Sequence, residues 1–74
     1  MIYKIHDNGR MKPSNFFQDL ESAKLEVERR AKKLPWKMVT YWKENNNKYQ
    51  LFANFYDKEI DLKNSWIETI LVIA

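Results

Sequence analysis

The stretch between Asp19 and Pro35 is the part of this sequence that most restricts the fold. Its apolar residues recur at spacings of three and four, which gives one apolar stripe along a helix: Leu20, Ala23, Val27, Ala31 and Leu34. Asp19 supplies the short acceptor side chain of an N-cap, and Pro35 ends the helix. Since this is the only helix that the sequence indicates, the rest of the chain has to form a sheet against it.

The segments on both sides of this helix have the patterns of strands. Before it, Ile2–His6 leads through Asp7-Asn8-Gly9, a hairpin signal, into Arg10–Phe17, where Pro13 predicts an edge strand or a partly irregular one. Three strand candidates follow the helix: Trp36–Lys43, Tyr49–Tyr56 and Ser65–Ile73. The sequence therefore predicts an α+β fold, a single domain over residues 1–74, with one helix packed on an antiparallel sheet of four to five strands in the order β-β-α-β-β-β.

The register of the hairpin around Asn45–Asn47 stays open at this stage. A three-residue loop would place Val39 and Tyr41 opposite Ala53 and Leu51, with Met38, Trp42 and Phe52 on the far face. A four-residue loop would instead place Trp42 and Met38 opposite Leu51 and Phe55, with Val39, Tyr41 and Phe52 outside. Because one residue of slip exchanges the faces of a strand, the two registers expose different aromatic residues.

The composition excludes several classes of protein. The chain has no cysteine and therefore no disulfide, thiolate metal site or thiol nucleophile, and its single glycine excludes a glycine-rich phosphate loop. The N-terminus is polar by its sixth residue, and no apolar run is long enough to span a bilayer. We therefore expect a cytoplasmic protein with no signal peptide and no membrane association.

The net charge of +3 is unevenly distributed. Residues 1–34 contain eight Lys and Arg against five Asp and Glu, whereas residues 35–74 contain five of each. A basic cluster surrounds the end of the helix: Arg29, Arg30, Lys32, Lys33 and Lys37. It is either a binding patch for an anionic partner or a solvated helix end, stabilised by the helix dipole and by pairs such as Glu26 with Arg30.

Eight aromatic residues lie between Trp36 and Trp66, which is a large number for a chain of 74 residues: Trp36, Tyr41, Trp42, Tyr49, Phe52, Phe55, Tyr56 and Trp66. A core this small does not hide all of them, and aromatic side chains left on a surface are typical binding anchors. We expect Trp42, Phe52 and Tyr56 to be such anchors. Surface aromatics of this kind serve either a protein contact, self-association included, or base stacking.

No set of residues predicts catalysis or a metal site. His6 has no partner that would make it a general base or a zinc ligand. Four acidic residues have a spacing similar to that of an EF-hand calcium loop: Asp57, Glu59, Asp61 and Glu68. However, Leu62 occupies the position where the sharp turn of such a loop needs glycine. We therefore expect no enzyme activity, no cofactor and no bound metal.

The residues Phe17-Gln18-Asp19-Leu20-Glu21-Ser22-Ala23-Lys24, which open the charged helix, resemble a pattern of small phage and prophage proteins. In those proteins a hairpin leads into one helix and then a meander of strands, and some are anti-CRISPR-like inhibitors. The resemblance implies a stoichiometric inhibitor that occupies the surface of a host defence or ribonucleoprotein complex.

Two functional hypotheses follow from the sequence. The first is a non-enzymatic interaction protein, an inhibitor of a host nucleic-acid-processing complex that binds through Trp42, Phe52, Tyr56 and the basic helix end. The alternative is a small protein that binds single-stranded nucleic acid with the same groups. A homodimer formed through a sheet edge is compatible with both.

Overall fold

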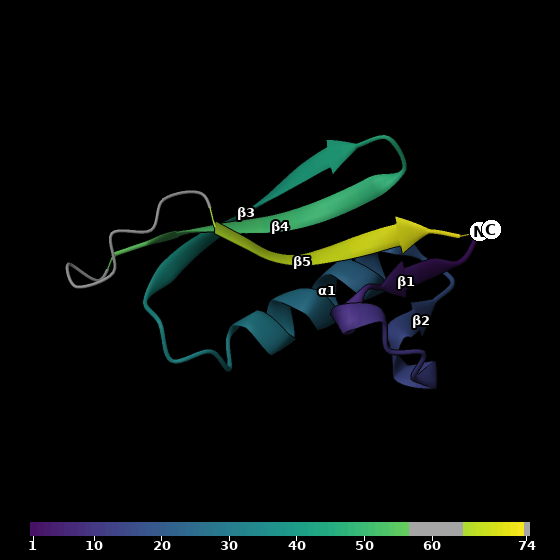
Figure 1. The fold of residues 1–74 in the computed structure, drawn as a ribbon, viewed down its shortest axis with the longest axis horizontal. Coiled ribbons are helices and arrows are strands. Elements are labelled where there is room, and N and C mark those ends of the chain that lie inside the picture. Colours follow the sequence, from purple (N-terminus) through teal and green to yellow (C-terminus); the bar gives the residue numbers. More distant parts are fainter. Residues whose placement is uncertain (57–64, 74) are drawn as a thin grey trace.

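The computed structural model describes residues 1–56 and 65–73 of the chain. Its regular elements are β1 (Tyr3–Ile5), β2 (Phe16–Phe17), α1 (Leu20–Ala31), β3 (Met38–Asn45), β4 (Lys48–Phe55) and β5 (Ser65–Val72). The strands form one antiparallel sheet in the order β2-β1-β5-β4-β3, so that β5 joins the N-terminal strands to the β3–β4 hairpin (Figure 1). The predicted α+β fold and its order of elements are confirmed.

The helix α1 packs on one face of the sheet, mainly against β1, β2 and β5. Its buried residues are Ala23, Val27 and Ala31, which belong to the predicted stripe, and they meet Ile5, Leu51 and Ile70 in the core. Asp19 is the N-cap, because its carboxylate accepts a hydrogen bond of 2.9 Å from the Ser22 backbone N–H. The helix ends at Ala31, before the predicted stop at Pro35, and a turn follows in which Leu34 N–H donates to the Ala31 carbonyl.

The first two strands are joined by a longer connection than a tight hairpin. Asp7, Asn8 and Gly9 have φ angles of 44°, 56° and 81°, and this left-handed backbone turns the chain away from the sheet. A second short turn, Pro13–Asn15, brings it back to β2. The strand β2 has only two residues and lies at one edge of the sheet, as Pro13 had indicated.

The β3–β4 hairpin has the register that places Trp42 opposite Leu51 and Met38 opposite Phe55. Pairing extends to Asn45 and Lys48, which leaves a turn of two residues. These are Asn46 and Asn47, with φ angles of 41° and 63°, and asparagine tolerates this left-handed conformation better than most residues. Val39, Tyr41 and Phe52 therefore face away from α1, as in the second of the two predicted registers.

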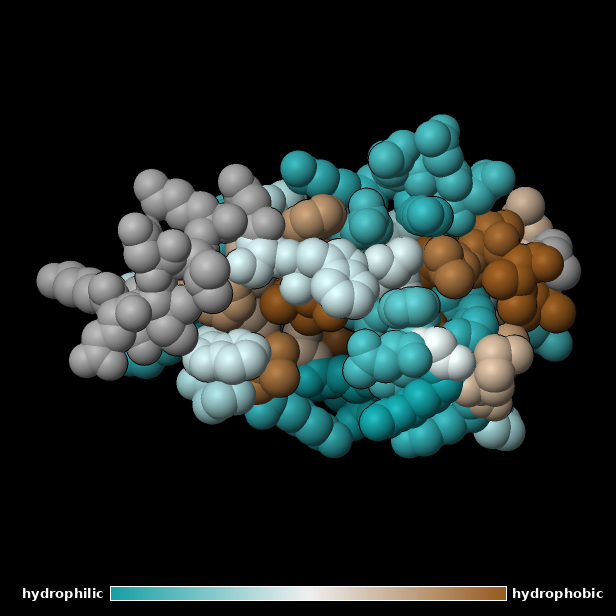
Figure 2. Space-filling model, in the orientation of Figure 1, coloured by the Kyte–Doolittle hydropathy of each residue, from teal (hydrophilic) through white to brown (hydrophobic). Residues whose placement is uncertain are grey.

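Exposed aliphatic residues gather where the two termini meet, at the right of Figure 2. Ile73 N–H donates to the Ile2 carbonyl and holds the two ends together, and Met1, Ile2 and Ile73 are all exposed there. None of the helices in the described part of the chain is long and apolar enough to cross a membrane. Three of the acidic residues with the spacing of a calcium loop, Asp57, Glu59 and Asp61, lie outside the described residues.

Candidate functional site

A row of aromatic side chains crosses the face of the sheet opposite α1, which we call the open face. Tyr41 on β3 pairs with Phe52 on β4, and their rings stack with centroids 5.9 Å apart and an interplanar angle of 20°. Phe52 in turn pairs with Trp66 on β5. The His6 ring follows at 6.3 Å from the Trp66 ring. We call Tyr41, Phe52, Trp66 and His6 the aromatic row.

A β-bulge brings Trp66 into this row. The β4–β5 register shifts between Leu51 and Phe52, so that Leu51 pairs with Glu68 but Phe52 pairs with Trp66. The extra residue is Ile67, which packs against the core instead of occupying the position opposite Phe52. A bulge inserts one residue and changes the direction of the side chains beyond it. Without the bulge, Ile67 would face outward and Trp66 would point toward α1.

The charges on the open face are of one sign. At its described strand positions the charged residues are Lys4, Lys43 and Lys48, and none is acidic. The Lys43 ammonium lies 5.0 Å from the centroid of the Phe52 ring and 5.8 Å from that of Tyr41, in cation–π geometry. Lys4 is buried, and its ammonium donates to the carbonyls of Ile5 and His6. Lys43 and Lys48 are therefore the cations that this face presents.

The carboxylates of the neighbouring strands point elsewhere. Glu44 is paired with Tyr49 on the α1 side of the sheet. The Glu68 carboxylate accepts hydrogen bonds of 3.2 Å from the Asp7 N–H and 2.9 Å from the Thr69 N–H. Neither of these side chains opposes the lysines of the open face.

A shallow groove of about 580 Å³ lies along the aromatic row. It is lined by His6, Lys48, Gln50, Phe52, Trp66, Thr69 and Leu71. The Trp66 indole N–H donates to the Thr69 hydroxyl at 2.7 Å, which fixes the ring while 46% of the residue stays exposed. The groove thus has an apolar, aromatic floor with the Gln50 amide and the Lys48 ammonium beside it.

Trp42 does not belong to this face, contrary to our expectation. It is paired with Leu51 on the α1 side, where its indole N–H donates to the Glu28 carboxylate at 2.8 Å. The Lys24 ammonium lies 5.4 Å from the Trp42 ring centroid and 5.5 Å from that of Tyr49. Trp42 therefore connects the β3–β4 hairpin to the helix instead of serving as a free anchor on the open face.

The predicted basic cluster is divided. Arg29 and Arg30 both donate to the Glu26 carboxylate at 2.7 Å, and these hydrogen bonds lower the pKa of Glu26 to about 2. Arg29, Arg30 and Lys33 border a hollow that Asp7 and Glu26 share. Lys32 and Lys37 line a different one. The five cations thus border two different hollows, and two of them are already paired with a carboxylate.

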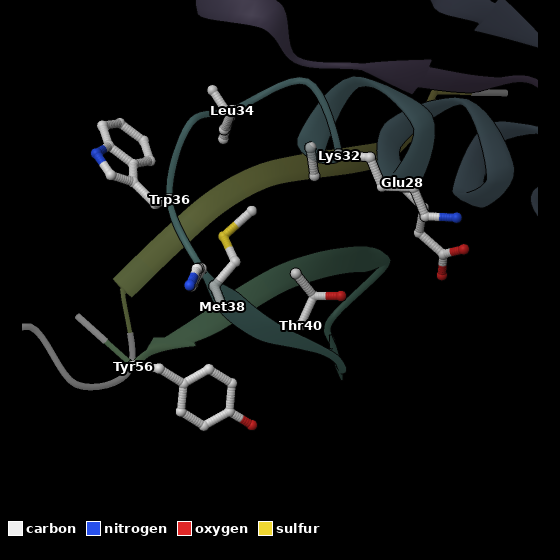
Figure 3. A pocket seen from close by; sticks show the side chains of 9 residues that line it. Glu28, Lys32, Leu34, Trp36, Met38, Thr40 and Tyr56 are labelled. Carbon is white, nitrogen blue, oxygen red and sulfur yellow. The ribbon is translucent and has the colours of Figure 1, made fainter.

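The second hollow, about 610 Å³ in volume, lies between the C-terminal end of α1 and β3, and we call it the helix-end pocket (Figure 3). Met38 and Thr40 line it from β3, and Leu34 and Trp36 line it from the segment after the helix. The Trp36 ring also meets the Phe55 ring edge-on, at 5.8 Å between centroids. Tyr56, which is exposed, borders this pocket and not the aromatic row.

Of the three predicted aromatic anchors, Phe52 alone lies in the aromatic row. Sequence reasoning missed Tyr41, Trp66, His6 and Lys43. The position of Tyr41 could have been predicted from the sequence, since the second of the two registers already placed Tyr41 and Phe52 together on the outer face. Trp66 was not, because its direction depends on a bulge that leaves no mark in the alternation of Ser65–Val72.

Within residues 1–56 and 65–73, no three His, Cys, Asp or Glu side chains come together in a group that could hold a metal ion. The one histidine contacts the Trp66 ring and lines the groove. The chemistry that this surface offers is therefore stacking, hydrogen bonding and attraction of anions.

Comparison with known proteins gives no relative: no protein-family model matches the chain, and neither the curated proteins nor the solved structures contain a significant match. Functional inference therefore rests on the residues of the open face.

Proposed function

We propose that this protein binds single-stranded nucleic acid on its open face. The observation that carries the proposal is the aromatic row, aligned across three strands and accompanied by lysines without a carboxylate at the described positions of that face. Successive bases stack on aromatic rings of such a sheet, and this stacking tolerates any sequence because every base has a π-face. Lys43 and Lys48 are placed to attract the phosphates.

The groove supports a strand that runs across β4 and β5. Trp66 offers a fixed indole, and the Phe52 ring lies on the neighbouring strand, about 5 Å away in the pairing direction. Side chains that can hydrogen-bond to base edges lie on the same floor, namely Gln50 and Thr69. A segment of two or three nucleotides fits this arrangement.

The broader expectation of a non-enzymatic interaction protein is compatible with this proposal. A protein that binds the nucleic acid of a host defence or ribonucleoprotein complex on this surface would inhibit that complex. That role stays a prediction. Direct capture of a protein by Trp42 has less support, because Trp42 bonds to Glu28 beneath the sheet.

Two exposed tryptophans allow a matched test. Trp66 is 46% exposed and lies in the aromatic row, whereas Trp36 is 43% exposed and lies at the helix-end pocket. We expect Trp66→Ala to weaken binding of a fluorescent oligothymidine by roughly 5- to 150-fold, the equivalent of ~1–3 kcal/mol for one stacked base. Trp36→Ala should leave the affinity within about twofold of the parent, since single surface changes away from a site have small effects.

Fluorescence anisotropy measures both affinities, and circular dichroism confirms that each variant is folded. Lys43→Gln and Lys48→Gln should each reduce the slope of log K against log salt by roughly 0.7. Failure of the parent protein to bind single strands at low salt would contradict the proposal. Equal losses for Trp66→Ala and Trp36→Ala would do so as well.

A further inference from the structure

The groove along the aromatic row is built from successive cross-strand pairs of β4 and β5. Phe52 pairs with Trp66 and, on the other side of the bulge, Gln50 pairs with Thr69. All four residues line the groove. Directly opposed residues of an antiparallel pair have Cβ atoms about 4.5–5.5 Å apart. A polar pair therefore lies beside the aromatic pair, where the edge of a base stacked on Phe52 or Trp66 would reach it.

The Thr69 hydroxyl has a proton to donate into this groove. Its oxygen accepts a hydrogen bond of 2.7 Å from the Trp66 indole N–H. A hydroxyl combines one donor with two acceptor positions, and the indole fills one of the acceptor positions. Among the described residues no group accepts the hydroxyl proton, although Thr69 is only 7% exposed. This proton is therefore a nearly buried donor that a ligand in the groove would satisfy.

The Gln50 amide supplies a donor and an acceptor side by side. It has no hydrogen bond to another residue in the described part of the chain, so both of its ends are open to a ligand. Every base carries a donor next to an acceptor on its Watson–Crick edge, and a terminal amide can turn to match either order. Gln50 by itself therefore holds the edge of a base without selecting one base over another.

The third group on the Watson–Crick edge distinguishes the bases. In cytosine, thymine and uracil this group is the O2 carbonyl, which accepts a hydrogen bond from a hydroxyl such as that of Thr69. Adenine has a C–H at this position, which would leave the Thr69 proton without a partner. Guanine has an amino group, which would have to share the Thr69 oxygen with the Trp66 indole. Gln50 and Thr69 together thus complement the edge of a pyrimidine better than that of a purine.

We propose that Thr69 determines base specificity on the open face while Gln50 positions the base, so that the protein prefers pyrimidine-rich single strands. The inference rests on the proposed function, since it concerns a base stacked on Phe52 or Trp66. Stacking alone gives no reason for such a preference, because every base has a π-face. A nearly buried donor does give one, because adenine leaves it unpaired.

Fluorescence anisotropy with three strands of equal length at one salt concentration tests the preference: oligothymidine, oligodeoxycytidine and oligodeoxyadenosine. We expect the parent to bind the two pyrimidine strands roughly 2- to 10-fold more tightly than the adenine strand, the value of one hydrogen bond. Thr69→Val removes the hydroxyl but keeps the branched shape, and it should lower this ratio by about the same factor. Thr69→Ser keeps the hydroxyl and should keep the ratio.

Two further variants separate base reading from other effects. Gln50→Leu should also lower the ratio, because the edge of the base is no longer held. Lys48→Gln is the matched control, since loss of a phosphate contact weakens binding uniformly across sequences and should leave the ratio unchanged. Adenine strands also stack on themselves, so the change in the ratio between variants is the decisive quantity. Circular dichroism checks the fold, and Gln50→Leu decides the matter if Thr69→Val does not fold.

The outcomes distinguish this inference from the proposed function. Equal affinity of the parent for all three strands, or a ratio that Thr69→Val and Gln50→Leu leave unchanged, would overturn the inference alone. A Thr69→Ser variant that loses the preference as Thr69→Val does would overturn it as well. Failure of the parent to bind any of the three strands at low salt would overturn both the inference and the proposed function.

Discussion

Asn15 connects three parts of the N-terminal region through a fully buried side chain. Its amide donates to the Asp7 carboxylate at 3.1 Å and to the Arg10 carbonyl at 3.2 Å, and its side-chain oxygen accepts from Arg30 at 2.8 Å. The first of these bonds is the main reason why the pKa of Asp7 is below its ordinary value. Asn15 thus fixes the long connection between β1 and β2 against the helix.

We expect Asn15→Ala to lower the free energy of unfolding by about 2 kcal/mol, because buried polar groups lose their partner. It should also raise the pKa of Asp7 toward its ordinary value. Urea denaturation and an NMR titration of the Asp7 carboxyl measure the two effects. Ser14→Ala is the control, since only the backbone carbonyl of Ser14 contacts Arg30. An unchanged stability for Asn15→Ala, or an equal loss for Ser14→Ala, would contradict this role.

At the scale of elements, α1 contains the carboxyl group with the largest pKa shift among the described residues. Arg29 and Arg30 hold the pKa of Glu26 at about 2, against an ordinary value of 4.5. A depressed pKa in the folded state stabilises the protein above the unfolded pKa, and this contribution is lost as the pH falls. The loss therefore occurs between about pH 4.5 and about pH 2. Since Arg29 is largely exposed, solvent screening reduces the contribution to about 1 kcal/mol.

We therefore expect Glu26→Gln to lower stability by about 1 kcal/mol at neutral pH and to have a much smaller effect near pH 2, where the folded Glu26 carboxyl is half protonated. Thermal unfolding as a function of pH measures this difference. The control is Glu21→Gln, which removes a carboxylate from the same helix but no ion pair seen in the described residues. The Glu26 contribution is disproved if the parent and Glu26→Gln differ by the same amount at both ends of the pH range.

The elements also show what the sequence could predict and what it could not. The period of three to four residues located α1 and its buried stripe, and Asp19 located its start, because these signals are local. The asparagines predicted the turn, and the strand predicted at Tyr49–Tyr56 corresponds to β4. The register of the hairpin stayed open, since both loop lengths satisfied the local rules. Trp42 was expected on the surface and Trp66 was assigned to no face, because their directions depend on that register and on the bulge at Ile67.

At the scale of the whole molecule, the distribution of charge changes how the second half of the chain is understood. Counted along the sequence, residues 35–74 have no net charge, and a neutral segment by itself gives no reason to expect contacts with phosphates. Counted by face, Glu44 lies on the α1 side while Lys43 and Lys48 lie on the open face. A count of charges along the sequence averages over both faces of a strand, whereas binding depends on the charges of the one face that contacts the ligand. The basic helix end, which the sequence offered as a second candidate, is partly neutralised by Glu26.

The central claim is that the open face, and not the helix end, contacts nucleic acid. An NMR titration of the ¹⁵N-labelled protein with oligothymidine tests it most directly, because it reports on both surfaces in one experiment. We expect the largest shift changes at Tyr41, Phe52 and Trp66, including the Trp66 indole N–H, with little change at Arg29, Lys33 or the Trp36 indole. Changes centred on the end of α1, or the absence of any change at low salt, would contradict the claim.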